Sequence, residues 1–378
     1  MAAKPFLIYL LTFSGHVLCA SHYLFSGFFS GDTIVALEFD DAASTLSVVN
    51  NITINASTGS KWIAFDTSHE NLYVATTGFI QSYGIDSDLD LKYQSNVSLA
   101  SDCSNANFIV ASAAEPYTVF GAPYNSGCSS LAISVDSGAL NTSFASLEYD
   151  SAAGVHGLAL SPANDFIYSA DDMGNAIWVH SYDNSSGVVE EKQKVSAPTG
   201  ANPRHLAVHP NGHFVFVLYE ELSEIAVYSR DVASGQLTDT NTTYSLIPST
   251  FTNTSSYWAD EALLSVPSTN DSTSSPKYLI CSTRSRETSA PGYVTAFSLD
   301  SVTGDIAEQL FIVPTTSSGG SANAVSPALF SEDYFAITDS ASNFVEVWKM
   351  ETEAGNSTTA VVAHLNLESG PANAVWLN

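Results

Sequence analysis

Short hydrophobic runs recur along the whole chain, some alternating with polar residues and some continuous, and turns rich in Gly, Asn, Asp, Ser and Pro separate them. Alternation with a period of two indicates a strand buried on one face, and a continuous apolar run of about four to eight residues indicates a fully buried strand. The periodicity of about 3.6 residues that marks an amphipathic helix is hard to find. The pattern therefore predicts an all-β protein.

The strand pattern also repeats at a fixed interval. The segment HGLALSPANDFIYSADDMGNAIWVHSYD, which begins at His156, aligns with RHLAVHPNGHFVFVLYEELSEIAVYSRD, which begins at Arg204, at an offset of 48 residues. Each copy contains a strand, a turn with a proline, a second strand, a short loop and a third strand. A period of roughly 40 to 50 residues with several strands per copy is typical of a β-propeller, in which blades repeat around an axis.

Two strand positions occur seven times each. The first begins at residues 61, 106, 156, 204, 261, 322 and 372, and the second at residues 22, 71, 116, 165, 213, 277 and 333. The chain therefore opens in a second strand and ends in a first strand, so that its two ends complete one blade. We predict a single domain over residues 21–378, a seven-bladed β-propeller closed by pairing of the N- and C-terminal strands in one blade. A solenoid or a two-sheet sandwich would explain the repeat but not these matching ends.

Two segments rich in Ser, Thr and Asn, residues 240–260 and 267–276, interrupt the repeat. We expect both to be surface loops between strands rather than domain boundaries.

Residues 1–20 have the pattern of a secretory signal peptide, with one lysine, an apolar run from Phe6 to about Phe13 and small residues near Cys19 and Ala20. The alternative is a membrane anchor, which needs roughly 20 apolar residues, whereas polar and small residues interrupt this run from position 14 onward. No later stretch is long enough to span a bilayer. We expect a secreted, extracellular protein, with association with a cell wall as a further option.

Nine N-x-[ST] sequons agree with export and predict N-glycosylation. Their asparagines are Asn51, Asn55, Asn96, Asn141, Asn184, Asn241, Asn253, Asn270 and Asn356.

Three cysteines remain when Cys19 leaves with the signal peptide, and an odd number leaves one unpaired. Cys103 and Cys128 flank one segment of hairpin size, so we predict a disulfide between them. Cys281 lies inside the apolar run YLICST and is expected to be a buried strand thiol.

The chain of 378 residues is 45% hydrophobic, only 13% charged, and has a formal net charge of -28. Nucleic acid is excluded as a partner, because phosphate backbones are bound by basic surfaces. An anionic small molecule would need a local cluster of positive charge to overcome the field of the protein. HExxH, CxxC and Asp-rich calcium motifs are absent from the sequence, so we predict neither a metal site nor a cofactor.

Arginine is rare in this chain, which has four: Arg204, Arg230, Arg284 and Arg286. Arg204 enters a first strand and Glu220 leaves the second strand of the same hairpin, about equally far from the turn at residues 210–212. Both should therefore lie at one end of the ring. The repeat offset places His156 at the position of Arg204 and Asp172 at the position of Glu220.

Aligning KYLICSTRSR, from residue 277, with HFVFVLYEE, from residue 213, places Arg284 at the position of Glu220 as well. Three consecutive blades thus direct these residues to the same mouth of the propeller, which predicts a pocket. Arginines bind carboxylates bidentately and histidine transfers protons near neutral pH, so a polycarboxylate ligand suits the set. The alternative is a structural ion-pair network that fixes neighbouring blades. Arg286 is expected either in the pocket, as a substrate contact beside Asp172, or on the surface.

The motifs GVHG at residue 154, NPRHLAVHPNG at 202, LYE at 218 and STR at 282 resemble those of the fungal 3-carboxy-cis,cis-muconate lactonizing enzymes, the carboxymuconate cyclases. These belong to a lactonase-type seven-bladed propeller family that includes bacterial 6-phosphogluconolactonase. The resemblance implies that the catalytic residues are His156, Arg204, Glu220 and Arg284. It also implies a cofactor-free isomerase of aromatic-compound catabolism, which closes a muconate-type polycarboxylate into a lactone.

In this implied reaction Arg204 and Arg284 hold carboxylates and stabilise developing charge, and His156 donates or accepts the proton. Glu220 orients one of these groups or takes part in proton transfer. The enzymes of this family that degrade aromatic compounds work inside the cell, whereas this chain has an export signal. Two alternatives follow: a lactonase that hydrolyses a small lactone, and a non-catalytic secreted or cell-wall glycoprotein on the same scaffold.

Overall fold

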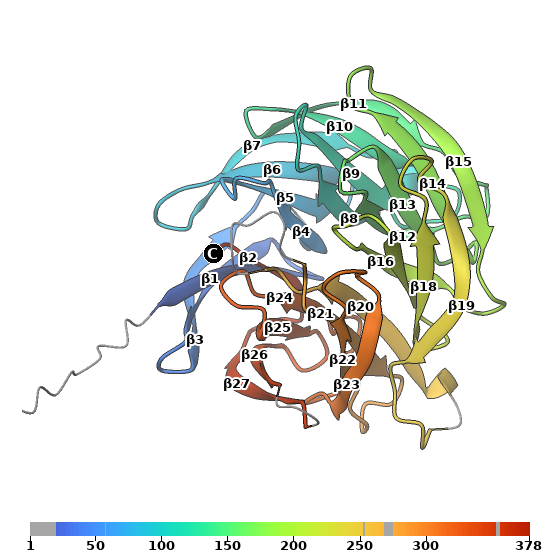
Figure 1. Ribbon diagram of the computed structural model, residues 1–378. Coiled ribbons are helices and arrows are strands. Elements are labelled where there is room, and N and C mark those ends of the chain that lie inside the picture. Colours follow the sequence, from blue (N-terminus) through green and yellow to red (C-terminus); the bar gives the residue numbers. More distant parts are fainter. Residues whose placement is uncertain (1–19, 57, 252–253, 268–274, 353–355) are drawn as a thin grey trace, which may run out of the picture.

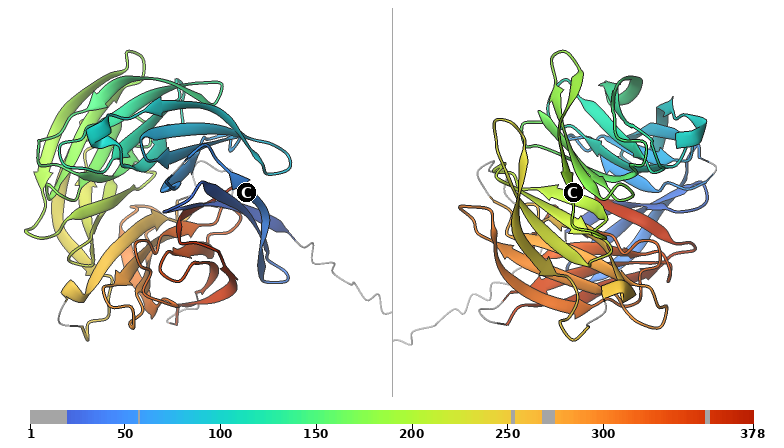
Figure 2. Two further views of the ribbon diagram at one scale, coloured as in Figure 1. Left: turned by 180° about the vertical axis from the view of Figure 1, so that it is seen from behind. Right: turned by 90° about the vertical axis from the view of Figure 1, so that its right-hand side faces the viewer.

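The computed structural model describes residues 20–56, 58–251, 254–267, 275–352 and 356–378. Its strands form seven separate four-stranded antiparallel sheets, which are arranged as blades around a central axis (Figure 1). The ring is also seen from behind in Figure 2. The prediction of an all-β, seven-bladed propeller is confirmed.

The first three blades contain the following strands, given from the axis outward. Blade 1 consists of β28 (Pro371–Trp376), β1 (Ser21–Phe28), β2 (Thr33–Asp40) and β3 (Thr45–Thr53). Blade 2 consists of β4 (Trp62–Phe65), β5 (Asn71–Thr76), β6 (Phe79–Ile85) and β7 (Leu91–Ser98). Blade 3 consists of β8 (Ala106–Ala111), β9 (Thr118–Pro123), β10 (Ser130–Asp136) and β11 (Ala139–Leu147).

The remaining blades repeat this order. Blade 4 consists of β12 (Val155–Leu160), β13 (Phe166–Asp171), β14 (Ala176–Asp183) and β15 (Val188–Ser196). Blade 5 consists of β16 (Pro203–Val208), β17 (Phe214–Tyr219), β18 (Glu224–Arg230) and β19 (Leu237–Ser245). Blade 6 consists of β20 (Tyr257–Leu264), β21 (Tyr278–Ser285), β22 (Tyr293–Leu299) and β23 (Ile306–Pro314). Blade 7 consists of β24 (Val325–Pro327), β25 (Tyr334–Asp339), β26 (Phe344–Glu351) and β27 (Thr358–Asn366). Two short 3-10 helices, η1 (Ser101–Cys103) and η2 (Thr254–Ser256), lie in connections between blades.

The two ends of the chain close the ring within blade 1. The last strand, β28, pairs antiparallel with β1, with Leu24 opposite Trp376 and Phe25 opposite Val375. The side chain of Asn373 on β28 then joins blade 1 to blade 2, because its amide accepts from the backbone N–H of Ile63 and donates to the carbonyl oxygen of Ile63, each at 3.1 Å. The predicted closure is confirmed.

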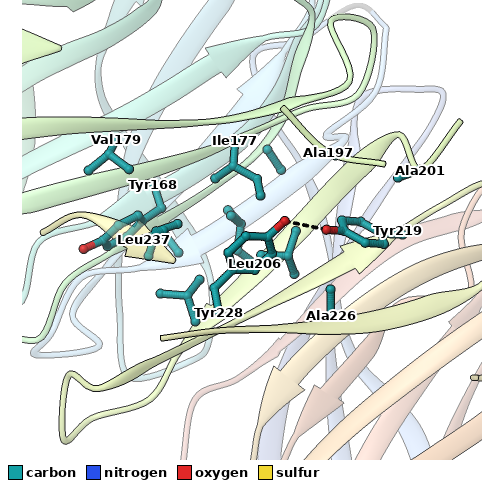
Figure 3. Close-up of a cluster of buried hydrophobic side chains, with 14 of the residues drawn as sticks. Tyr168, Ile177, Val179, Ala197, Ala201, Leu206, Tyr219, Ala226, Tyr228 and Leu237 are labelled. Carbon is teal, nitrogen blue, oxygen red and sulfur yellow. Dashed lines mark hydrogen bonds between the residues drawn. The ribbon is translucent and has the colours of Figure 1, made fainter. Parts of the chain in front are cut away.

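Hydrophobic side chains fill the space between neighbouring blades. Each of the seven largest clusters of buried residues joins one blade to the next, so that the core is a ring of seven layers. Figure 3 shows the cluster between blades 4 and 5, where the hydroxyl groups of Tyr219 and Tyr228 are hydrogen-bonded at 2.6 Å. Second strands such as β17, with the sequence FVFVLY, are nearly continuous in hydrophobicity because both of their faces are covered.

The outermost strand of each blade was not part of the repeat that the sequence predicts, which contains three strands. These strands, such as β19 with the sequence LTDTNTTYS, have mostly exposed side chains and little apolar signal. All seven are bulged against the third strand of their blade. Bulges and polar side chains discourage further pairing at a sheet edge.

The expectation that residues 240–260 form a loop was wrong at both ends of the segment. Residues 240–245 complete β19, and residues 257–260 begin β20. The Thr and Tyr residues at the end of β19 suit an exposed strand. Much of the second expected loop, at 267–276, lies outside the described residues.

The cysteines have the predicted states. Cys103 and Cys128 form a disulfide with a Cα–Cα distance of 5.7 Å, and Cys281 is a buried free thiol. In the described part of the chain no helix is long and apolar enough to cross a membrane.

Residues 1–19 of the predicted signal peptide (1–20) lie outside the described residues, as do Asn253 and Asn270. Of the other sequon asparagines, Asn184 is half-buried and six are exposed: Asn51, Asn55, Asn96, Asn141, Asn241 and Asn356. Export and glycosylation stay predictions.

The substitution Asn373→Ala should lower the free energy of unfolding by about 2 to 4 kcal/mol, because it leaves the buried N–H and carbonyl of Ile63 without partners. Chemical denaturation measures this loss. Asn366→Ala, at an exposed position of β27, is the control and should change stability by less than about 0.5 kcal/mol. Equal stability of the two variants would show that the amide of Asn373 does not hold the ring closed.

Candidate active site

The first residues of the innermost strands form one mouth of the central channel. Every blade has the same strand order and antiparallel pairing, so its innermost strand runs in the same direction along the axis. The starts of β8, β12, β16 and β20 therefore lie at the same end of the ring. Side chains from consecutive blades meet there although they are about 50 residues apart in sequence.

Four of these strands are bulged at the mouth. The pairing with the second strand of the blade shifts by one residue between Ala106 and Phe108, Val155 and Gly157, Pro203 and Leu206, and Ala259 and Glu261. The residues at the shifts are Asn107, His156, Arg204 with His205, and Asp260. A bulge turns the side chain of the extra residue away from the regular alternation. It therefore lets neighbouring residues such as Arg204 and His205 line the same cavity.

Gly157 allows two of these strands to approach closely. A Cβ atom at this position would lie 2.6 Å from the carbonyl oxygen of Arg204 and 3.1 Å from the Cα of His205. The close contact of β12 with β16 brings Nδ1 of His156 to 3.0 Å from Nε2 of His205.

A cavity of about 170 Å³ occupies the mouth, and all seven blades contribute to its wall. The charged and polar side chains that line it are Lys61, Asn107, Tyr124, His156, Arg204, His205, Asp260, Glu261, Arg284 and Ser321, and the remaining wall is formed by Phe29, Trp62, Ala322, Ala324 and Ala372.

Two arginines and two carboxylates form a buried cluster beside this cavity. Nη1 of Arg204 donates to both carboxylate oxygens of Glu220 at 3.3 Å, and Nη2 of Arg284 donates to Oε1 of the same glutamate at 2.7 Å. Oδ1 of Asp260 lies 2.9 Å from Nη2 of Arg204 and 3.6 Å from Nη1 of Arg284. We call these four residues the arginine–carboxylate cluster.

Within this cluster the opposite charges stabilise each other in their ionised forms. Burial opposes the charge of Arg204, but the carboxylates of Glu220 and Asp260 outweigh burial and raise the pKa of Arg204. Burial also opposes the charge of Asp260, yet Arg284 and Arg204 hold the pKa of Asp260 below its usual value. The ion-pair network that the sequence left as an alternative is therefore present, and three of its four residues, Arg204, Asp260 and Arg284, also line the cavity.

His156 lines the same cavity, next to Tyr124 and Asn107. Its ring contacts the edge of Tyr124, with 4.9 Å between ring centroids, and its Nε2 accepts from the amide of Asn107 at 3.2 Å. Burial lowers the pKa of His156 well below its ordinary value, and the charges of Arg204, His205 and Arg284 act in the same direction. The imidazole is therefore neutral in the free protein near pH 7.

The structure brings together the four residues implied as catalytic, but with unequal access. His156, Arg204 and Arg284 line the cavity, whereas Glu220 contacts the two arginines and is not among the lining residues. Asp172 does not line the cavity but accepts a hydrogen bond from the hydroxyl of Tyr124, which does. Burial and the charge of Glu220 raise the pKa of Asp172.

Arg286 lies at the surface near the mouth. Its side chain is 30% exposed, pairs with Glu221, and stacks on the ring of Trp258 at 4.0 Å from the ring centroid. Arg284 lies 5.0 Å from the centroid of the same ring. Arg286 is absent from the cavity lining, which favours the surface option of the two that the sequence left open.

Comparison with known proteins places the chain in a family. Residues 22–365 match the family model described as "Lactonase, 7-bladed beta-propeller". The chain belongs to this family. It is 30% identical over 337 residues to the carboxy-cis,cis-muconate cyclase of Neurospora crassa, which covers 85% of this chain and 89% of that protein. It is 31% identical over 240 residues to muconate cycloisomerase 1 of Cutaneotrichosporon cutaneum, which covers 59% of each chain.

Solved structures of low identity show the same fold. The periplasmic gluconolactonase of Pseudomonas aeruginosa superposes with a TM-score of 0.76 at 17% identity, covering 94% of this chain and 99% of that chain. A protein from Lactobacillus plantarum superposes with the same TM-score at 16% identity, covering 95% and 100%. The resemblance to the carboxymuconate cyclases is confirmed, and it supports the prediction of an intramolecular lactonizing enzyme.

The sequence pattern did not reveal seven of the ten charged and polar residues of the cavity wall: Lys61, Asn107, Tyr124, His205, Asp260, Glu261 and Ser321. A signal for several of them was present. A polar residue occurs within the first two positions of most first-strand segments, as in ANFIVAS, RHLAVH and EALLSV. The strict alternation of a regular strand would point Arg204 and His205 to opposite faces, so only the bulge shows that both line the cavity.

A larger cleft of about 630 Å³ lies between blades 2 and 3. Four carboxylates, those of Asp66, Glu70, Glu115 and Asp136, line it. Its charge is unsuited to an anionic ligand, whereas the mouth cavity presents three cationic side chains.

The substitution Arg204→Ala should lower the free energy of unfolding by about 3 to 5 kcal/mol, because it removes compensation from two buried carboxylates. Arg286→Ala is the matched comparison at the same mouth and should cost about 0 to 1 kcal/mol, as expected for an exposed pair. Thermal and chemical unfolding of both variants measure the difference. Similar small losses would contradict a buried, coupled cluster.

Proposed function

We propose that this protein catalyses the cofactor-free, intramolecular lactonization of a small muconate-type polycarboxylate at the mouth cavity. The observation that carries the proposal is the enclosure of a histidine and three cationic side chains, Lys61, Arg204 and Arg284, in one cavity of about 170 Å³. Such a volume suits a small acid rather than a drug-sized molecule. The kinship with a carboxy-cis,cis-muconate cyclase supports the same reaction class.

The cations are placed to bind carboxylates from several directions. Arg204 and Arg284 lie on blades 5 and 6, whereas Lys61 precedes β4 on blade 2, so a substrate in the cavity meets positive charge on two sides. Lys61 donates to the side chain of Asn105, which holds its ammonium at the mouth. Guanidinium groups bind carboxylates in fixed bidentate geometry, and substrate carboxylates would share the arginines with Glu220 and Asp260.

The reaction is written as an internal addition. One carboxylate oxygen of the substrate forms a bond to a carbon of the conjugated alkene, and the π electrons move to the adjacent carbon and its carboxyl group as an enolate. His156, which takes up a proton from solvent as the anionic substrate binds, then donates that proton to the carbon. This leaves a neutral imidazole and a lactone that contains all the atoms of the substrate and one added proton. Arg204 and Arg284 stabilise the enolate charge through preorganised donors, and confinement holds the reacting oxygen against the alkene.

The purified protein should consume 3-carboxy-cis,cis-muconate with loss of the diene ultraviolet absorbance and formation of a lactone. Opening of added small lactones without loss of the diene would instead indicate hydrolysis. Inactivity on both substrate classes would contradict the catalytic proposal and favour a glycoprotein that keeps the scaffold alone.

The substitution His156→Ala should lower kcat by about 10² to 10⁴ with a small effect on KM, because it removes the proton donor. Arg284→Ala should raise KM, because the lost charge-assisted contact weakens binding by about 1.5 to 3 kcal/mol, and should also lower kcat through the lost enolate stabilisation. Steady-state kinetics of both variants separate the two roles. Equal effects on KM and kcat in both would contradict this division.

We further propose that the protein acts outside the cell, from the leader pattern and the sequons. Intact-mass measurement of protein expressed in a eukaryotic host should show processing near Ala20 and a mass decrease on enzymatic deglycosylation. An unmodified chain that still begins at Met1 would contradict export.

A further inference from the structure

A chain of buried hydrogen bonds runs from Glu261 on β20 to His156 on β12. Oε1 of Glu261 lies 2.8 Å from Nδ1 of His205, and Nε2 of His205 lies 3.0 Å from Nδ1 of His156. Exposure of the three residues is 2%, 3% and 7%, so the chain is shielded from water. Three consecutive blades contribute one residue each.

Asn107 determines the proton positions in this chain. Its amide nitrogen lies 3.2 Å from Nε2 of His156 and 3.4 Å from the carbonyl oxygen of the same residue. A carbonyl oxygen can only accept, so the amide presents its N–H₂ group here, and Nε2 of His156 accepts as well. A neutral imidazole has one N–H. The proton of His156 is therefore on Nδ1 and is donated to Nε2 of His205.

The tautomer of His205 follows from that of His156. Nε2 of His205 is an acceptor, so its proton is on Nδ1 and is donated to Glu261. Both histidines are thus held in one tautomer by a carboxylate at the far end. The arrangement leaves Nε2 of His156 as the basic atom of the cavity.

We propose that His205 and Glu261 are positioning residues for His156, which keep its proton on Nδ1, keep Nε2 unprotonated and able to accept a proton, and stabilise the imidazolium that forms as a polycarboxylate binds. This inference rests on the proposed function for its catalytic consequence, but the tautomers do not depend on it. An orienting carboxylate of this kind fixes the imidazole and compensates its positive charge without contacting the substrate.

The charges around His156 explain why the proton arrives with the ligand. In the free protein, burial and the neighbouring arginines favour the neutral ring. A bound polycarboxylate offsets those arginines and favours the imidazolium, and Glu261 supplies the compensating charge through His205. The titratable and charged groups that share the cavity wall with His156 are Lys61, Tyr124, Arg204, His205, Asp260, Glu261 and Arg284, and Asp172 and Glu220 contact members of this wall.

A second histidine–glutamate pair provides a control, with an equally buried carboxylate and a histidine that is 37% exposed. Oε1 of Glu346 lies 2.8 Å from Nδ1 of His364, the same atoms at the same distance as in the Glu261–His205 pair, and both carboxylate side chains are 2% exposed. Glu346 is on β26 and does not line the mouth cavity. The substitution Glu346→Gln therefore has the structural effect of removing a buried glutamate charge beside a histidine, without the effect on His156.

The first measurement is the histidine tautomer state in the ligand-free protein by ¹⁵N NMR. His156 should show a protonated Nδ1 and an unprotonated Nε2, and Glu261→Gln should disturb this signal while Glu346→Gln leaves it unchanged. A protonated Nε2 on His156 in the parent protein would overturn the positioning role. Folding of each variant is checked by its unfolding transition, and His205→Gln serves as a second variant if Glu261→Gln does not fold.

The second measurement is proton uptake on binding of propane-1,2,3-tricarboxylate, a saturated acid that cannot lactonize. Calorimetry in two buffers of different ionisation enthalpy near pH 7 should show uptake of up to about one proton per ligand for the parent protein and for Glu346→Gln. Glu261→Gln should take up less than about half as much. Equal uptake by all three would overturn the role of Glu261. Absence of binding by the parent protein would instead overturn the proposed ligand class, and the tautomers would still decide the positioning role.

The third measurement separates a positioning role from a structural one. With active substrate, Glu261→Gln should lower kcat by about 10- to 100-fold, the usual effect of removing an outer partner of a functional histidine. KM should stay within about twofold. Glu346→Gln should leave both constants unchanged, and a similar loss of kcat in Glu346→Gln would show that the effect is one of stability alone.

Discussion

The antiparallel pairing of β28 with β1 is the constraint on which the rest of the structure depends. It joins residues from opposite ends of the chain, such as Leu24 and Trp376, and it completes the ring of innermost strands between β24 and β4. The hydrophobic clusters on both sides of blade 1 need this closure, because Trp376 packs against blade 7 while Val375 packs against blade 2. Only a closed ring brings all seven blades to one cavity.

Burial of positive charge inside an acidic chain is the second organising feature. The protein has 11 Lys and Arg against 39 Asp and Glu, yet Arg204, Arg230 and Arg284 are all buried. At the mouth, Glu220 and Asp260 hold two of these arginines in place before any ligand arrives. The cluster is a structural ion-pair network, and under the proposed function it would also serve as a prepared anion site, since the fixed guanidinium groups lose little freedom on binding.

Much of the fold and part of the site could be predicted from the sequence, because a propeller repeats in sequence as it repeats in space. The 48-residue offset between His156 and Arg204 was sufficient to place both at one mouth. The bulges could not be predicted, since one extra residue leaves no mark in a pattern of hydrophobic and polar positions. They explain why Asp260 and His205 line the cavity, and why the Glu261–His205–His156 chain is visible only in three dimensions.

The outer strands illustrate a second limit of the sequence pattern. They bury little apolar surface, so sequences such as LTDTNTTYS resemble loops, and backbone pairing with the third strand of the blade determines their structure. The leader and the sequons are signals for export and glycosylation, and they say nothing about how side chains pack. The geometry of the mouth cavity does not depend on export or glycosylation.

The central claim is that the mouth cavity binds a small polycarboxylate between the arginines and His156. A crystal structure of the protein soaked in propane-1,2,3-tricarboxylate tests it most directly. The ligand is expected in the cavity at the channel mouth, with carboxylate oxygens within hydrogen-bond distance of Arg284 and Lys61 and in contact with His156. An empty cavity at saturating ligand, or a ligand bound only in the cleft between blades 2 and 3, would contradict it.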